Sequence, residues 1–502
     1  MALRPPEFEM FMTHMPVVEK TTHSMIPRQL RRILLASIAA IGLGGCETFS
    51  ADGGIGPVQA LVKADLGKDA IRIRSEGDAA TAKTRVGKLL RAPLTAESAV
   101  QIALLNNRGL QAAYDEIGIS EAQFVQASLP ENPRISLSRL AGSGEVEVER
   151  RLVGNLVSLF LLQPRTELAA GKLKQTQLRA AEETLKLAAD TRRAYYRAVG
   201  ARQLVGYLQR ASLTAQAASE LLRELGQTGA VGKIEQAREQ AFYAELVAQL
   251  AQARLRERTE REKLTRLMGA WGADAAFKLP ASLPPISRAP RSMAQIETDA
   301  LRRRIDLKIA RMEVDNLAKV LGLTTTTRYL GLIEATVTSK STRTRTIDAN
   351  GNAGQDRLSQ FALDLDVQIP IFDSGEARTR EAEETYSQAV NRLLEKAVNI
   401  RSEAREAYAG WRGTYDIARH YLTEVLPLRK IVSDESLLRT NGMLSDVSTL
   451  IVDSRSQVLS GSAAIEAQRD FWLADADLKA ALVGGGLAGL GDAPKSSGSA
   501  AN

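Results

Sequence analysis

The most regular alternation of apolar and polar positions in the chain lies in residues 361–371. Because successive side chains of a strand point to opposite faces, this stretch predicts a two-faced β-strand. About ten residues of this pattern suit a transmembrane strand whose polar side lines a barrel lumen. A half-buried strand of a soluble sheet has the same period, so the stretch alone leaves both interpretations open. The apolar face would carry Phe361, Leu363, Leu365, Val367, Ile369 and Ile371, and the lumen-facing candidates are Asp364, Asp366 and Gln368.

Three further stretches predict strands. Residues 329–345 are rich in threonine and β-branched residues and predict a partner strand. The polar loop at 350–356 would join this pair and face outside. In the first half of the chain, residues 135–140 alternate, and residues 153–162 form a longer apolar run. The chain therefore supplies four candidate strands in two pairs.

Two long helices follow the first pair of strands. Residues 168–225 contain no proline, and apolar residues recur there at spacings of three and four, as they do in a return helix from residue 237. This spacing is a heptad seam, which predicts coiled-coil packing. At 1.5 Å per residue, the first helix would extend roughly 87 Å. An ordinary bundle does not usually need helices this long, so their pairing with strands favours a membrane pore that continues as a tube.

Other helices follow from the same patterns. A long helix is expected over residues 372–439, where Pro427 should kink it without ending it. Residues 94–129 are amphipathic and predict a helix that two prolines end. Thr95 is a candidate N-cap, but Ser98 stands where a capping box has glutamate, which predicts an incomplete box.

The second half of the chain repeats the pattern of the first: helix, two strands, very long helix, glycine-marked turn, long helix. Ala103 aligns with Ala300, and Gly229 later aligns with Gly442. A repeat of this size predicts the architecture before any single residue does. The expected organisation is a first repeat over residues 94–290, a second over 291–483 and a flexible Gly/Ser-rich tail over 484–502.

A lipoprotein signal peptide is predicted over residues 25–45. It combines a basic start with an apolar run at 33–43 that is too short to span a membrane. The following Leu43-Gly44-Gly45-Cys46 resembles a bacterial lipobox. We therefore expect a covalent lipid on Cys46, the only cysteine of the chain.

The surroundings of Cys46 carry further expectations. Glu47 follows it, where an aspartate would suggest retention in the inner membrane, so sorting to the outer membrane of a Gram-negative bacterium is favoured. Residues 1–24 precede a complete signal peptide, which suggests that Met25 is the true start. Residues 46–93 should form a lipidated, extended tether against the body of the protein.

Composition excludes several classes of function. The formal charge of +7 on 502 residues is mild and evenly spread, which does not suggest a nucleic-acid surface. After the signal peptide only one histidine, His420, and the lipid-bearing cysteine remain. This inventory cannot build a His/Cys metal cluster or a His-based catalytic triad. We therefore expect no enzyme, no metal site and no cofactor beyond the lipid.

The strand count bears on stoichiometry. Four strands from one copy cannot close, and open strand edges are not tolerated in lipid. Eight strands from two copies would be filled by their own side chains, whereas twelve strands from three copies leave room for an aqueous channel. A membrane pore built from this chain should therefore be a homotrimer.

Three stretches resemble the TolC-type outer-membrane efflux protein family: residues 94–107, Leu129-Pro-Glu-Asn-Pro133 and Ile369-Pro-Ile-Phe-Asp-Ser-Gly375. The resemblance covers residues 94–482, and the lipobox is similar to that of the lipid-anchored branch. It implies a mainly α-helical fold with membrane β-structure. Three copies would form a 12-stranded outer-membrane barrel continuous with a periplasmic coiled-coil tunnel. A periplasmic adaptor and an inner-membrane pump of the resistance-nodulation-division class would be partners.

In that family the helix-hairpin tips form the periplasmic aperture and contact the adaptor. The corresponding turns here lie at residues 225–233 and 439–446, where Gly229 and Gly442 would permit the backbone to reverse. The resemblance also implies a role for Asp446, just after the second tip. Asp446 could pair with Lys233 or Arg439 to hold the aperture shut, or three copies of it could select cations; exposed charges of little consequence are the alternative.

The function implied is a passive outer-membrane duct of a tripartite efflux system, which makes and breaks no bond. Two alternatives remain open from the sequence. One is the outer duct of a type I protein secretion system, which shares the fold. The other is a lipid-anchored periplasmic coiled-coil scaffold whose strands never enter a membrane.

Overall fold

The computed structural model describes most of the chain after the predicted signal peptide. Residues 1–24, the signal peptide, Cys46 and Asp446 lie outside the described residues, as does the tail after Gly484. A compact unit begins at Phe49. The described residues are 48–287, 289–290, 295–329, 333–347, 353–442 and 447–484.

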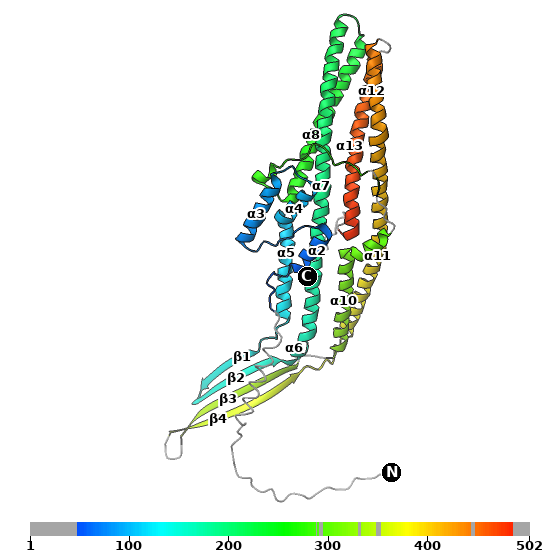
Figure 1. Ribbon diagram of the computed structural model, residues 1–502. Helices are drawn as coiled ribbons and strands as arrows, with labels where there is room; N and C mark the ends of the chain where they lie inside the picture. Colours follow the sequence, from blue (N-terminus) through cyan, green and yellow to red (C-terminus); the bar gives the residue numbers. More distant parts are fainter. Residues whose placement is uncertain are drawn as a thin grey trace, which may run out of the picture. The chain divides into compact units, whose positions relative to one another are not determined.

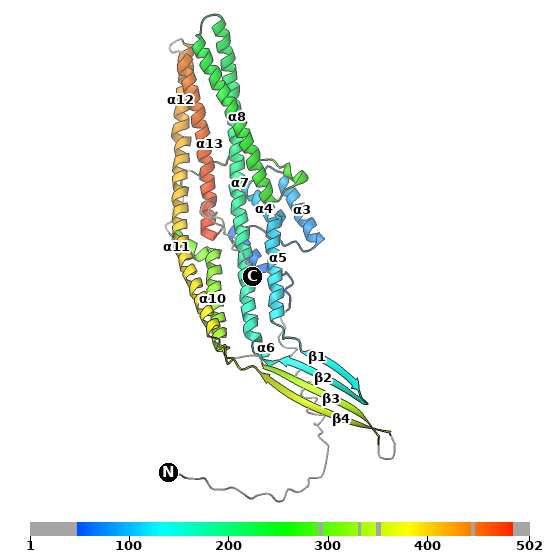
Figure 2. The same cartoon turned by 180° about the vertical axis from the view of Figure 1, so that it is seen from behind.

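Within this unit, helices extend from a four-stranded sheet toward two hairpin tips (Figures 1 and 2). The first half contains α2 (Gly56–Leu66), α3 (Glu76–Leu90), α4 (Ala96–Asn106), α5 (Arg108–Ala127), α6 (Leu156–Phe160), α7 (Leu162–Gln227) and α8 (Lys233–Met268). The second half contains α9 (Ile296–Arg303), α10 (Ile305–Thr326), α11 (Glu376–His420), α12 (Leu426–Asn441) and α13 (Val447–Val483).

The longest element is α7, a single helix of 66 residues that extends about 99 Å. It packs along α8, α13 and α5, so the predicted long helix and its return partner are confirmed. In the second half, α11 continues into α12 through a π-helical turn at Tyr421–Val425. Pro427 lies two residues after this turn, as the second residue of α12. Because proline removes an N–H donor and crowds the preceding turn, it perturbs the helix there without ending it, as predicted.

A short break divides the helix predicted over residues 94–129 into α4 and α5. Asn107 has extended backbone angles, and its side-chain oxygen accepts a hydrogen bond from Leu110 N at 3.0 Å. Its amide nitrogen also donates to Leu267 O at 2.9 Å, which ties the break to the end of α8. The second half has an equivalent break at Arg304, between α9 and α10. The prediction of one continuous helix was wrong because asparagine offers a cap inside the amphipathic pattern.

Aromatic rings join the long helices at mid-length. Tyr196 of α7 stacks on Trp472 of α13 at 5.2 Å between ring centroids. Phe471 of α13 then contacts Tyr415 of α11 at 5.8 Å. Tyr415 and Trp411 are buried, as are alanines along the same faces. Small residues therefore let the helices approach closely, and a few large rings fill the space that remains.

The sheet has the order β1-β2-β3-β4, and every neighbouring pair is antiparallel. The residues Ser143 and Gly144 form the two-residue turn between the first two strands, and both have positive φ angles, as a tight hairpin requires. The strands are β1 (Arg134–Gly142), β2 (Glu145–Asn155), β3 (Ile333–Ile347) and β4 (Ala353–Val367).

Two predicted strand positions were wrong. The second strand covers Glu145–Asn155 and not residues 153–162, because the Asn155 side chain accepts a hydrogen bond from Ser158 N at 3.2 Å and starts the helical turn α6. The last strand begins at Ala353, inside the predicted polar loop, and ends at Val367. Pairing with the long strand β3 extends β4 through polar sequence that local patterning assigns to a loop.

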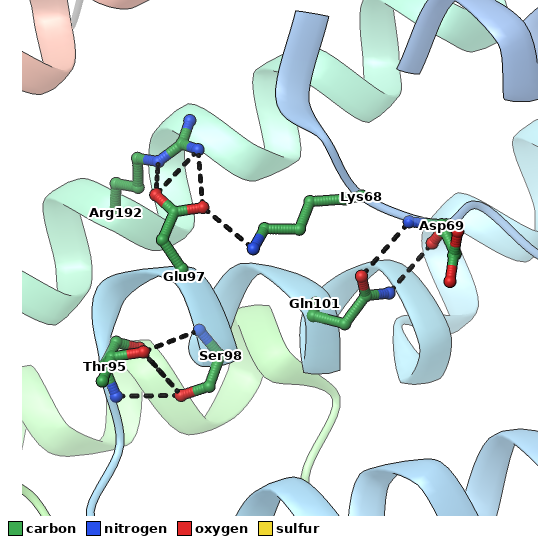
Figure 3. Close-up of polar contacts among 7 residues, drawn as sticks. All are labelled: Lys68, Asp69, Thr95, Glu97, Ser98, Gln101 and Arg192. Atoms are coloured by element: carbon green, nitrogen blue, oxygen red, sulfur yellow. Dashed lines mark hydrogen bonds and ion pairs between the residues drawn. The ribbon is translucent and has the colours of Figure 1, made fainter. Parts of the chain in front are cut away.

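The N-terminal segment was predicted to be an extended tether, but it contains the helices α2 and α3. Figure 3 shows how the link between them docks on α4 and α7. Lys68 Nζ lies 3.1 Å from the Glu97 carboxylate, which also accepts hydrogen bonds from Arg192 of α7. Gln101 exchanges hydrogen bonds with the Asp69 backbone at 3.2 and 2.9 Å. The segment is therefore held against the first repeat by specific polar contacts.

The N-terminus of α4 also corrects an expectation. Ser98 N donates to Thr95 Oγ1 at 3.0 Å, and Thr95 N donates to Ser98 Oγ at 2.8 Å (Figure 3). The capping box is complete, because the short serine hydroxyl reaches the N-cap amide that glutamate usually contacts.

Acid should loosen the docked N-terminal segment. Burial raises the pKa of Glu97, but the Arg192 and Lys68 charges outweigh burial, so the pKa lies below the ordinary value of 4.5. A carboxyl whose pKa is lowered by folding stabilises the folded form above its unfolded pKa, and this contribution is lost as the pH falls through the folded value. Hydrogen exchange over residues 56–90, corrected for intrinsic rates, should therefore accelerate below about pH 4.

The control for this effect is Glu97→Gln, which cannot titrate. It should show faster exchange of the segment already at pH 7 and a smaller additional change in acid. Equal acid responses in the variant and the unmodified protein would contradict the assignment to Glu97.

Candidate channel wall and helical tips

The strand register defines two faces of the sheet. Directly opposite residues of an antiparallel pair share a face. Odd-numbered residues of β1, β3 and β4 therefore lie on one face with even-numbered residues of β2. We call this the apolar face and the opposite side the polar face. The large apolar side chains of the apolar face are Ile135, Leu137, Val146, Val148, Leu152, Ile333, Val337, Ile347, Phe361, Leu363, Leu365 and Val367.

The apolar face is exposed in the single chain. Ile135 is 79% and Leu363 is 69% exposed, and Phe361 and Leu365 are similarly open. The part of this face nearest the helices is apolar without interruption, and such a surface marks contact with a membrane or another protein. The two buried side chains of the four strands, Thr336 and Thr342, both lie on the polar face, which is therefore the more closely packed side.

The polar face carries all the carboxylates of the four strands. Its three basic side chains are each paired with a glutamate of the same face: Arg134 with Glu334 at 3.4 Å, Arg151 with Glu149 at 2.8 Å and Lys340 with Glu147 at 2.8 Å. Seven carboxylates against three cations give this face a net charge of −4. The carboxylates are Glu145, Glu147, Glu149, Glu334, Asp356, Asp364 and Asp366.

The three lumen candidates lie close to the helical end of the sheet. Asp364 and Asp366 are on the polar face of β4, opposite Thr336 and Glu334 respectively. In the described part of the chain, neither aspartate forms an ion pair. Gln368 falls one residue beyond the end of β4, so it is not a strand residue as predicted.

The strand β2 was not predicted, although its sequence carries a clear signal. Glu145, Glu147 and Glu149 alternate with valine, which is the same period-two signal as in β4. The strand was instead assigned to the apolar run around and after Asn155, which is longer and more hydrophobic. Treating glutamate as the polar position of an apolar–polar alternation would have identified this strand.

The first hairpin tip joins α7 to α8. Gly229 has a φ of 77°, and Ala230 N donates to Leu225 O at 3.0 Å, which closes the end of α7. Lys233 is the first residue of α8 and follows Gly232. The tip therefore reverses the chain as predicted, with a left-handed conformation that favours glycine.

The second tip differs from the expectation. Gly442 follows α12 with a φ of −81°, which any residue adopts, so it does not have the positive φ that was expected to reverse the chain there. Arg439 pairs with Glu435 one turn earlier on the same helix, at 3.2 Å. Asp446 lies outside the described residues, so its pairing with Lys233 or Arg439 stays a prediction.

The two tip glycines form a matched pair for mutagenesis. Gly229→Ala should destabilise the first tip by about 1 kcal/mol, because alanine is disfavoured at positive φ. Gly442→Ala should be nearly neutral. Hydrogen exchange in residues 220–240 measures the first effect. Equal changes in exchange at both tips would contradict the conformational argument.

In the described part of the chain, no helix combines the length and apolar character needed to cross a bilayer. No protein-family model matches the sequence, and no curated protein matches it. Solved structures do match. CusC aligns over 77% of this chain and 91% of its own, with a TM-score of 0.64 and 16% identity. The outer-membrane channel OprN aligns over 85% and 95%, with a TM-score of 0.63 and 16% identity.

The CmeC outer-membrane channel of Campylobacter jejuni aligns over 80% of this chain and 86% of its own, with a TM-score of 0.61 and 15% identity. At these identities the likeness establishes the fold. The chain has the fold of outer-membrane channel proteins, with a small sheet attached to long helical hairpins. This confirms, at the level of the fold, the resemblance to TolC-type proteins that the sequence suggested.

Proposed function

We propose that this chain is the outer-membrane channel of a tripartite efflux system. The observation that carries the proposal is the two-faced sheet at one end of long helical hairpins, in a chain with the fold of outer-membrane channels. An exposed apolar face opposite a charged one is what a transmembrane barrel wall requires. A periplasmic scaffold would leave the apolar face in water, so the sheet argues against that alternative.

Closure of the wall supports a trimer. The strand order leaves β1 and β4 as the two edges of the sheet. In lipid these edges must pair, and the simplest closed assembly joins β4 of one copy to β1 of the next. Three copies give twelve strands, which is wide enough for a water-filled lumen lined by the polar faces. The helical hairpins of the three copies would continue the lumen as a periplasmic tunnel.

The remaining parts of the proposal follow from this assembly. A lipid on Cys46 would anchor each copy at the inner side of the outer membrane. The hairpin tips, which include Gly229, Lys233 and Arg439, would meet a periplasmic adaptor bound to an inner-membrane pump. The channel itself would conduct passively, and the pump would supply the energy.

Native mass spectrometry on protein extracted from outer membranes tests the assembly, with Cys46→Ser as the control for the lipid. A lipid-modified trimer that also conducts ions in a planar bilayer is the expected result. A monomer or dimer with intact lipid and no conductance would overturn the proposal in favour of a periplasmic scaffold. Loss of resistance to small toxic compounds on gene deletion, with unchanged polypeptide export, would separate efflux from type I secretion.

A further inference from the structure

Five arginines lie on the apolar face of the sheet, and no carboxylate shares that face. All five side chains are exposed, and none forms an ion pair with a described residue. The charges of the sheet are therefore separated by sign: every carboxylate is on the polar face, and the apolar face carries only cations. These residues, named here the arginine belt, are Arg139, Arg150, Arg343, Arg345 and Arg357.

The arginine belt begins at a sharp boundary along the strands. From the helical end of the sheet up to the pair Leu363–Val337, every side chain of the apolar face is apolar or glycine. Arg150 lies in the next row of that face, level with Phe361, and the other four arginines lie further toward the strand tips. The belt therefore lies in the half of the sheet farther from the helices (Figure 1).

The distance from the helical end of the sheet to the far arginines of the belt matches the thickness of a bilayer. Ten residues separate Val367 from Arg357 on β4, or about 34 Å along the strand. With the usual strand tilt of about 40°, this corresponds to a height of about 26 Å, close to the apolar band of outer-membrane barrels. Arg139 and Arg150 lie two and four residues lower along the strands, so the match in depth rests on Arg343, Arg345 and Arg357.

Exposed aromatic side chains lie near the opposite end of the sheet. Phe160, Tyr329 and Phe372 lie at the junction of sheet and helices, and all three are largely exposed. Aromatic rings collect where the hydrocarbon core meets the headgroups. With this end at the periplasmic headgroups, the arginine belt falls at the outer ones.

Within the belt, Arg343 and Arg357 are directly opposite each other on β3 and β4. Like charges in this position are destabilising unless an anion lies between them. Arg345 is the diagonal neighbour of Arg357, so three guanidinium groups gather at one strand pair. The planar guanidinium fork suits phosphate oxygens, which it contacts through paired hydrogen bonds.

We propose that the arginine belt binds the phosphate groups of an anionic glycolipid in the outer leaflet of the outer membrane. The inference rests on the proposed function, because it requires the sheet to span that membrane. Bound phosphates would compensate the facing arginines and fix the depth of the barrel. In a leaflet of uncharged lipids the facing arginines would find no anion to compensate their charges.

The experiment uses the full-length trimer in neutral detergent, with bisphosphorylated lipid A as the probe and native mass spectrometry as the readout. The test variant is Arg343→Gln, Arg345→Gln and Arg357→Gln combined. Its matched control is Arg134→Gln, Arg151→Gln and Lys340→Gln, which removes three cations from the polar face. We expect the test variant to bind lipid A about tenfold to a hundredfold more weakly and the control to bind within about twofold of the unmodified protein.

Each other outcome has a defined meaning. Unchanged affinity of the test variant, an equal loss in the control, or equal binding of dephosphorylated lipid A would overturn the proposal. If inorganic phosphate displaces lipid A from the protein at an equal concentration, the arginines bind a free anion and the lipid proposal is overturned. The trimer mass of each variant and its conductance in a neutral bilayer show whether the variant is assembled. If the triple variant does not assemble, the single variant Arg357→Gln replaces it in the binding measurement. If the unmodified protein never conducts, the proposed channel function is wrong. If the variants conduct and bind lipid A as the unmodified protein does, only the proposed lipid binding by the arginine belt is wrong.

Discussion

Leu363→Arg should reduce the amount of assembled trimer in the outer membrane by about thirtyfold or more. The side chain lies on the apolar face, in the row of Ile135, Leu152 and Val337, well inside the apolar band. An arginine facing lipid near the middle of a bilayer costs about 2–4 kcal/mol, and every copy in the trimer carries it. The measurement is the trimer recovered from purified outer membranes, compared with total protein.

Ala362→Arg is the matched control for this prediction. Ala362 is the adjacent residue of β4, and it lies on the polar face opposite Thr338. The same arginine there would face water in the lumen, so assembly should be preserved. Equal trimer yields from the two variants would show that the apolar face does not contact lipid.

The second large effect concerns ion selectivity. Three copies of the polar face would place a charge of about −12 around the lumen, and such a wall attracts cations and excludes anions. Asp364→Asn combined with Asp366→Asn removes half of the net charge of each copy. The reversal potential in a potassium chloride gradient should therefore shift by about half of the way toward the unselective value.

A charge change on the opposite face provides the comparison. Arg357→Gln lies on the same strand but faces away from the polar side, so it should leave the reversal potential unchanged. A channel that conducts well but shows no cation preference would contradict the assignment of Asp364 and Asp366 to the lumen. Loss of selectivity with Arg357→Gln would reverse the two faces.

The strands show both the strength and the limit of sequence patterning. The apolar and polar faces of β4 could be predicted because side chains alternate with a period of two, whatever the strand pairs with. The position of β2 was missed although its glutamates alternate with valine, since the apolar run after Asn155 also resembles a strand and becomes a helix only through the Asn155–Ser158 hydrogen bond. The separation of the arginines from the carboxylates needed the register of all four strands.

The helical part follows the same rule. The seam of α7 predicted its length and its antiparallel partner, because heptad spacing is a local property of the chain. The breaks at Asn107 and Arg304 and the folded N-terminal segment were not predicted. The break at Asn107 combines a local cap with a contact to the distant Leu267, and the N-terminal segment docks where Glu97 pairs with the distant Arg192. The lipid on Cys46 and the pairing of Asp446 stay predictions, since both residues lie outside the described part of the chain.

The sequence by itself determined the class of architecture: long coiled-coil helices joined to two-faced strands, with a predicted lipid anchor. Periodicity, proline and glycine positions act within a few residues, so they can be read without knowing the fold. Only the tertiary structure decided which charges share a face and where the tips need glycine. It also decided how the N-terminal segment docks. The shared faces and the docking arise from pairing between residues about 100 to 200 positions apart, as for Glu97 with Arg192 and for Val146 with Arg343, and no local pattern encodes such a register.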